Sequence, residues 1–177
     1  CPELFRRDPL GAAFPAPLDL AALAREAEEV GALAIGVATD SETHGASERD
    51  LALVSKASGV PVLCIDFLVR DNQLYRSRLL GADSAILHAS ILDASEIARL
   101  LDVGRHMHVE CVVEAVDAPG VERALEAGAR IVSIDGRAGA ASEDLAALLA
   151  LVPAGPILIV RGVVATADDL AFLRGKA

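Results

Sequence analysis

The chain has 177 residues, of which 53% are hydrophobic and only 3% are aromatic. This length suits one domain, and the apolar fraction argues against intrinsic disorder. The formal net charge of -10 argues against nucleic-acid binding, which needs a basic surface to displace counterions. No apolar run approaches the ~20 residues of a membrane-spanning helix. We therefore expect no nucleic-acid partner and no membrane partner.

Six short apolar runs predict β-strands. In chain order they cover residues 32–39, 60–66, 84–88, 108–114, 130–135 and 156–161. Each run is rich in Val, Ile or Leu and is too short to be a helix. A core built from aliphatic side chains suits a parallel sheet that is covered by helices.

Helices are predicted between these strands. Five of them should follow a capping side chain, namely Asp19, Asp71, Ser95, Asp117 and Ser142. Two further starts resemble capping boxes, Ser47 with Asp50 and Thr166 with Asp169. Three helices should end at a glycine, because glycine readily adopts the left-handed conformation that stops a helix: Gly31, Gly81 and Gly128.

The regular alternation of strand and helix predicts a parallel α/β protein with right-handed crossovers. Two architectures fit this pattern, an open doubly wound sheet and a closed barrel. The length alone slightly favours the open sheet, because a complete barrel usually takes about 250 residues. No linker or break in composition divides the chain, so residues 1–177 are predicted to form a single domain.

The three cysteines are Cys1, Cys64 and Cys111. Two of them lie within apolar runs, and no Cys-x-x-Cys pair or His-spaced cluster is present. This usage is typical of reduced, buried cysteine, and we expect a cytoplasmic protein.

Four segments in consistent order resemble indole-3-glycerol phosphate synthase. Residues 61–101 begin PVLCIDF and continue GADSAILH, similar to PVLRKDF and GADAVLLI of that family. Residues 112–137 contain ERALEAGARIVSIDGR, similar to ERALAAGARIIGINNR. Residues 36–54 and 157–173 resemble the second strand with its loop and the seventh strand with its helix. The first two residues, Cys-Pro, match the Ser-Pro that follows the first strand of the family.

The resemblance implies a parallel (β/α)8 TIM barrel of the ribulose-phosphate-binding type. The first and eighth strands would be missing or incomplete in this chain, lying before Cys1 and beyond Ala177. Strands at an open edge invite pairing, so either the chain is part of a longer protein or a partner completes the sheet. In such barrels the chemistry takes place at the carboxyl ends of the strands.

The family reaction closes an indole ring on carboxyphenylamino-deoxyribulose phosphate, with loss of CO2 and water, as a step of tryptophan biosynthesis. The general acid of the family is the lysine of the RKDF motif, and the matching residue here is Ile65. An isoleucine cannot donate a proton or carry charge, so we expect it to fill the barrel interior. The resemblance therefore implies membership of a family of carbon-carbon lyases, with reduced or altered activity in this chain.

Other positions at the strand ends are candidates for the site. Glu114 matches the catalytic glutamate of the fifth strand, and Asp135 replaces a substrate-binding asparagine on the sixth. On the seventh strand Arg161, before Gly162, stands where the family has Glu-Ser before Gly; it could hold an anion or be a solvent-facing salt-bridge partner. The candidate catalytic residue is Glu114, and the candidate substrate-binding residues are Asp135, Arg161, Gly162 and His88.

Two functions from different classes remain open. Family resemblance favours an enzyme acting on a phosphorylated small molecule, whereas the missing lysine favours a non-catalytic barrel that binds or assembles with a partner. A third interpretation is another phosphate-binding parallel barrel. The carboxylates and His88 come from separate strands without metal-binding spacing, so we predict no metal and no cofactor. A homo-oligomer is an open expectation.

Overall fold

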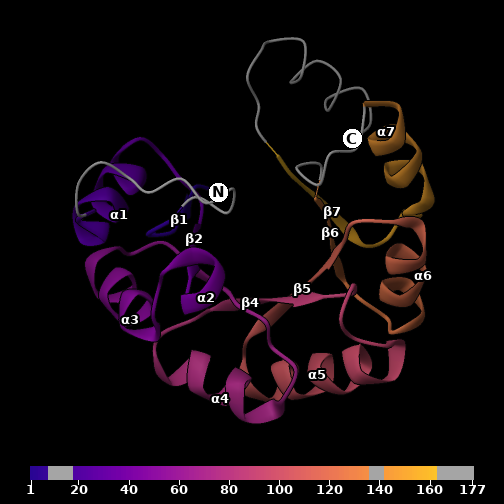
Figure 1. The fold of residues 1–177 in the computed structure, drawn as a ribbon, viewed down its shortest axis with the longest axis horizontal. Coiled ribbons are helices and arrows are strands. Elements are labelled where there is room, and N and C mark those ends of the chain that lie inside the picture. Colours follow the sequence, from indigo (N-terminus) through magenta and orange to yellow (C-terminus); the bar gives the residue numbers. More distant parts are fainter. Residues whose placement is uncertain (8–17, 136–141, 163–177) are drawn as a thin grey trace. The chain divides into compact units, whose positions relative to one another are not determined.

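The computed structural model of the chain describes residues 1–7, 18–135 and 142–162. These residues form seven strands that alternate with helices (Figure 1). The strands are β1 Glu3–Leu4, β2 Ile35–Ala38, β3 Val62–Ile65, β4 Ser84–His88, β5 Glu110–Ala115, β6 Ile131–Asp135 and β7 Ile157–Arg161. The helices are α1 Leu20–Glu29, α2 Ser41–His44, α3 Glu48–Ala57, α4 Asp71–Leu79, α5 Ala94–Met107, α6 Ala118–Glu126 and α7 Ser142–Leu151.

Two compact units share these elements. Unit 1 comprises Cys1–Leu87 and Arg99–Cys111, and unit 2 comprises His88–Ala98 and Val112–Ala177. The chain therefore passes between the units three times, within β4, within α5 and within β5.

In unit 1 the strands β1, β2, β3 and β4 are parallel neighbours in sequence order. Helix α3 packs against β2 and β3, and α1 packs against α3. Apolar side chains on the facing surfaces are removed from water, which supplies most of the stabilisation. Fully buried examples are Leu20, Ile35, Leu51, Val54 and Leu74.

In unit 2 the strands β5, β6 and β7 are also parallel neighbours in sequence order. Helix α7 packs against β6 and against α6. The register places Glu114 opposite Ser133 and Asp135 opposite Arg161. Because side chains alternate between the two faces of a strand, residues in register lie on the same face of the sheet.

All six predicted strands are present, and β1 adds a seventh to the described residues. The added strand has only two residues, which pair with Gly36 and Val37. So short a strand has no apolar run that could mark it in the sequence. It is the first strand in the described part of the sheet, and it follows Cys1, whereas the first strand was expected before Cys1.

The predicted helix starts are confirmed at Asp19, Asp117 and the capping box of Ser47 with Asp50. Helices α4 and α7 begin at Asp71 and Ser142 themselves, one residue earlier than predicted. The prediction of Ser95 as the start of α5 is wrong. The capping carboxylate is that of Asp93, which accepts a hydrogen bond from the Glu96 amide at 2.8 Å, while Glu96 accepts one from the Asp93 amide at 2.9 Å. The box of Thr166 and Asp169 lies outside the described residues.

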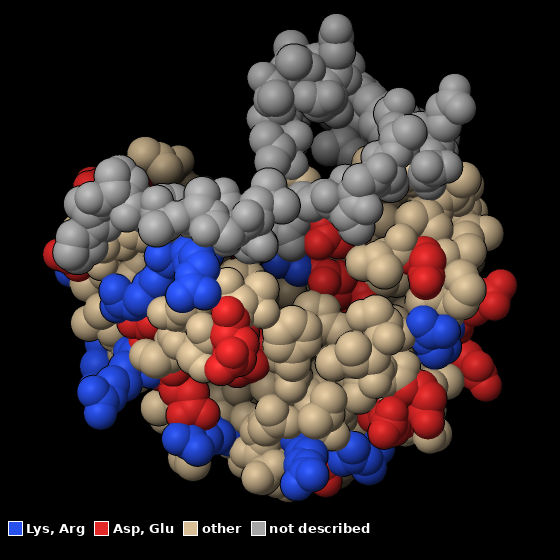
Figure 2. Space-filling model, in the orientation of Figure 1, with Lys and Arg blue, Asp and Glu red and all other residues tan. Residues whose placement is uncertain are grey.

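Charges of both signs alternate on the face shown in Figure 2. Several pairs within unit 1 are ion pairs, including Arg76 with Glu48 and Arg78 with Asp83. Among the described residues, no helix is long and apolar enough to cross a membrane.

The cysteines differ in exposure, since Cys1 is exposed whereas Cys64 and Cys111 are buried. Burial raises the pKa of the Cys111 thiol to about 12 and also raises the pKa of Cys64. Gly104 of α5 lies directly over Cys111, because a Cβ at Gly104 would come within 2.6 Å of the sulfur. The close approach of helix and strand explains why this thiol is shielded from water.

Candidate functional site

Glu114, near the carboxyl end of β5, is held between the imidazole of His88 and the guanidinium of Arg161. The residue is buried, and its Oε1 lies 3.0 Å from Nδ1 of His88, the last residue of β4. Its other oxygen, Oε2, forms an ion pair with Nη1 of Arg161, the last residue of β7. We call these three residues the Glu114 cluster.

The parallel strands of unit 2 explain why these side chains meet. The carboxyl ends of parallel strands lie at one edge of a sheet, and the Ala89 amide donates to the Glu114 carbonyl at 2.9 Å, which ties the end of β4 to β5. Residues in register share a face, so Glu114, Ser133, Asp135 and Arg161 lie on one side of the sheet. The opposite face carries fully buried apolar side chains, Val113, Val132 and Ile134.

The electrostatics of the cluster favour an ionised Glu114. Removing a carboxylate from water is costly unless the charge is paired and hydrogen-bonded. Arg161 supplies a permanent positive charge, since a guanidinium does not lose its proton in proteins. The contact between Nδ1 of His88 and the carboxylate favours a proton on Nδ1, so that neutral His88 carries its lone pair on Nε2.

Arg161 does not take the solvent-facing role considered from the sequence alone, and its role in holding an anion stays a prediction. It is not a solvent-facing salt-bridge partner, because its side chain is only 9% exposed and its partner is the buried Glu114. Val160 and Arg161 are adjacent, and only the register of β7 decides which of them shares a face with Glu114. The structure gives that position to the arginine.

Asp135 and Gly162 lie close in sequence to these residues, at the ends of β6 and β7. Asp135 is half-buried and pairs in register with Arg161. Gly162 is exposed, and a Cβ added there would meet no atom within 4 Å. No described protein atom demands a glycine at this position, so its expected role in phosphate binding stays a prediction.

Ser133 is a polar residue of this face that the sequence analysis missed. It is fully buried, and its Oγ has no hydrogen-bond partner among the described residues. The signal in the sequence was a serine inside an apolar strand, at a position where the similar family segment has glycine.

Ile65, at the position of the family lysine, lies in unit 1 and is 4% exposed. Its Cδ1 packs over Gly36 of β2, at 2.9 Å from where a Cβ would stand. The next residue, Asp66, accepts hydrogen bonds from Thr39 Oγ1 at 2.5 Å and from the Phe67 amide at 2.7 Å. Ile65 is thus an interior packing residue, as expected, and Asp66 holds the turn that follows.

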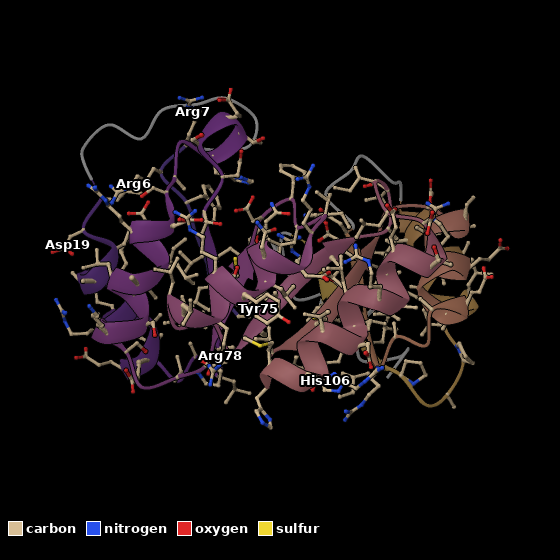
Figure 3. The ribbon with its side chains drawn as sticks, turned by 90° about the horizontal axis from the view of Figure 1, so that it is seen from below. Arg6, Arg7, Asp19, Tyr75, Arg78 and His106 are labelled. Atoms are coloured by element: carbon tan, nitrogen blue, oxygen red, sulfur yellow. The ribbon has the colours of Figure 1, made fainter. Side chains whose placement is uncertain are left out.

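Figure 3 shows which edge of unit 1 carries which charged residues. Arg7 lies at one edge, whereas Arg78 and His106 lie at the opposite edge. Arg7 belongs to the edge at which α2 follows β2, because its Nη1 donates to the Glu42 carbonyl. His106 is therefore remote from the carboxyl ends of the unit 1 strands. Over residues 1–7, 18–135 and 142–162, no group of three or more His, Cys, Asp or Glu is arranged to hold a metal ion.

The family model of indole-3-glycerol phosphate synthase matches residues 3–173. The indole-3-glycerol phosphate synthase of Kineococcus radiotolerans is 36% identical over 99% of this chain and 66% of its own length. That of Streptomyces griseus is 36% identical over 76% of this chain and 50% of its own length. The chain thus spans about half to two thirds of the length of these relatives.

Solved structures show the same fold at low sequence identity. An N-acetylmannosamine-6-phosphate 2-epimerase from Clostridium perfringens has a TM-score of 0.71 at 14% identity, covering 99% of this chain and 82% of its own. A 3-hexulose-6-phosphate synthase has a TM-score of 0.68 at 20% identity, covering 90% and 81%. The parallel fold is of the TIM-barrel class, which decides between the barrel and the open sheet. By its sequence and its fold, the chain belongs to the indole-3-glycerol phosphate synthase family.

Proposed function

We propose that this chain carries a diverged indole-3-glycerol phosphate synthase site, which binds a phosphorylated ligand but closes the indole ring much more slowly than relatives with the lysine. The observation that carries this proposal is the burial of Ile65 at the lysine position. General acid catalysis contributes about 10²–10⁴-fold in rate, so its loss would reduce turnover by a factor of that order. Carboxyphenylamino-deoxyribulose phosphate is the proposed substrate.

In this proposal Glu114 is the catalytic carboxylate, and Arg161, Gly162, Asp135 and His88 contact the ligand. Support comes from the position of Glu114 at a strand end and from the shared face of Asp135 and Arg161. A cytoplasmic location, a single domain, a homo-oligomer and the absence of metal and cofactor belong to the same proposal.

A non-catalytic barrel is the second candidate. It is favoured by the contacts of Glu114, whose two oxygens are both engaged, one by His88 and one by Arg161. A carboxylate that contacts an imidazole through one oxygen and a guanidinium through the other is a weaker base than one with free oxygens. Such a chain would bind a ligand or an assembly partner without turning substrate over.

An assay on carboxyphenylamino-deoxyribulose phosphate, with the full protein, tests the proposal. We expect turnover about 10²–10⁴-fold below that of a lysine-containing relative. Ile65→Lys should raise turnover, whereas Ile65→Met, of similar size and without charge, should not. Circular dichroism of both variants checks folding, because a buried ammonium without a partner destabilises a protein.

Three outcomes separate the candidates. Slow turnover that Ile65→Lys increases supports the diverged enzyme. Ligand binding by calorimetry without any turnover, in the wild type and in Ile65→Lys, supports the non-catalytic barrel. Wild-type turnover equal to that of a lysine-containing relative overturns the proposal.

A further inference from the structure

We infer that His88 is the proton-transfer group of this site, and that Glu114 acts as the positioning residue that orients it. The inference rests on the proposed function and changes one assignment within it. Glu114, proposed above as the catalytic carboxylate, acts through His88, which supplies part of the acid catalysis that the Ile65 position cannot supply. His88 was expected only to bind substrate, and its position at the end of β4 corresponds to an apolar residue in the similar family segment GADAVLLI.

The geometry of the His88–Glu114 contact carries the first step of the argument. At 3.0 Å, Nδ1 of His88 is within hydrogen-bond distance of Oε1 of Glu114. An imidazole held in this way presents Nε2 as the atom that gains and loses a proton, and the carboxylate stabilises the imidazolium that results.

The ion pair on the other side of Glu114 carries the second step. Arg161 forms its ion pair with Oε2, the oxygen that does not face His88. Arg161 cannot act as an acid at neutral pH, because its guanidinium keeps its proton. It instead favours the ionised form of Glu114. The ionised carboxylate is the form that accepts a hydrogen bond from Nδ1 of His88.

The exposure of the three side chains carries the third step. The side chain of His88 is 15% exposed, compared with 5% for Glu114 and 9% for Arg161. The His88 side chain is therefore the most exposed of the three. In the proton-transfer step the Nε2–H bond of the imidazolium breaks and an O–H bond forms on the sugar carbonyl oxygen. The electron pair stays on Nε2, and water reprotonates the ring.

The charged groups around His88 set the expected pH dependence. Glu114 contacts it, and Arg161 and Asp135 lie on the same face of the sheet from β7 and β6. As an acid, His88 is active only when protonated, so turnover should fall as pH rises through its titration. Glu114→Gln removes the negative charge that favours the imidazolium, so this fall should move to lower pH.

The test compares His88→Gln with His106→Gln in the full protein, using carboxyphenylamino-deoxyribulose phosphate as substrate. His106 is a matched control because it is exposed and lies on α5 in unit 1. We expect His88→Gln to lower kcat about 10²-fold or more and to flatten the pH profile, and His106→Gln to change neither. Added imidazole should restore part of the activity of His88→Gly, which a purely structural role would not allow.

The outcomes distinguish the inference from the proposed function. Wild-type turnover that His88→Gln leaves unchanged, with Tm showing a folded variant, overturns the inference and leaves the proposed function standing. Loss of turnover with an unchanged pH profile and no imidazole rescue also overturns it. Absence of wild-type turnover overturns the inference together with the catalytic form of the proposed function.

Discussion

The Ser133 hydroxyl lies on the buried face of β6 and has no hydrogen-bond partner within the described part of the chain. Burying an unpaired hydroxyl costs about 1–3 kcal/mol. Ser133→Ala should therefore increase the free energy of unfolding by about 1 kcal/mol, measured by urea denaturation. Ser77 is the control, because its Oγ donates to the Gln73 carbonyl at 2.9 Å, so that Ser77→Ala should not stabilise. A decrease in stability for Ser133→Ala would show that its hydroxyl has a partner in solution.

The individual residues of the site could be predicted only in part. Glu114 was identified from the family resemblance, and its place near a strand end follows from parallel topology. Its pairing with Arg161 was not predictable, because the two residues lie on strands separated by β6 and are 47 positions apart in the chain. A shift of one residue in the register of β7 would have placed Val160 on this face instead of Arg161.

Four helices end in the same hydrogen-bonded motif. The residue in the left-handed conformation is glycine in three of them and histidine in the fourth. At Gly31, Gly81, Gly128 and His108, the amide of this residue and the next amide bond back to carbonyls of the final turn, as in a Schellman motif. The three glycines have positive φ, and His108 has a φ of 56°, the only such non-glycine among the described residues.

His108→Gly should accordingly stabilise the protein, because the left-handed conformation costs a residue with a side chain about 1 kcal/mol. The matched control is Gly128→Ala, where a Cβ would meet no atom within 4 Å and the cost is that of the backbone conformation alone. Thermal unfolding should show a higher Tm for His108→Gly and a lower Tm for Gly128→Ala. A lower Tm for His108→Gly would mean that the imidazole makes a contact worth more than the backbone strain.

The capping box of α3 also anchors the amino-terminal segment. Asp50 accepts hydrogen bonds from Arg6 Nε at 3.0 Å and from the Ser47 amide at 2.9 Å, and it is 3% exposed. Burial opposes the ionisation of Asp50, but the hydrogen bonds from Arg6 and Ser47 outweigh it and the pKa of Asp50 is lowered.

A carboxyl group with a lowered pKa stabilises the fold at pH values above its unfolded pKa of about 4. That contribution is lost as pH falls through the lower pKa of the folded state. At pH 7, Asp50→Asn should reduce the free energy of unfolding by about 1–3 kcal/mol, and this difference from the wild type should shrink as pH falls below the unfolded pKa of about 4. Urea denaturation of both proteins across this pH range measures the difference in their free energies of unfolding. A gap that persists unchanged in acid would assign the loss to packing.

Helix starts illustrate why the elements were predictable and their boundaries less so. The strands and the helix ends at glycine depend on residues that are near one another in the chain, so they can be predicted from the sequence. At the start of α5, Asp93 and Ser95 are both good capping residues. The choice between them depends on the reciprocal bond to Glu96, which forms only from Asp93.

At the scale of the whole molecule, three elements have residues in both units. The boundary between the units falls between Leu87 and His88 in β4, between Ala98 and Arg99 in α5, and between Cys111 and Val112 in β5. Neither unit can unfold without disrupting elements that belong to the other. We therefore predict a single unfolding transition, with equal calorimetric and van't Hoff enthalpies. Two resolved transitions in calorimetry would contradict the prediction of one domain.

The family resemblance predicted the fold class of the whole chain better than periodicity did. Alternating strands and helices fit a barrel and an open sheet equally, and the chain length pointed to the open sheet. Closure is a property of how strands tilt and stagger over the complete sheet, which no local pattern records. The motif PVLCIDF carried that information only because it is similar to a family whose closure is already known.

The burial of Cys64 and Cys111 means that thiol labelling can distinguish the folded protein from the opened protein. A maleimide dye offered to the native protein should attach to Cys1, the exposed member of the three cysteines. The other two sulfurs should become reactive only when the helices leave the strands. Counting dye molecules per chain by mass spectrometry would then measure how often the protein opens.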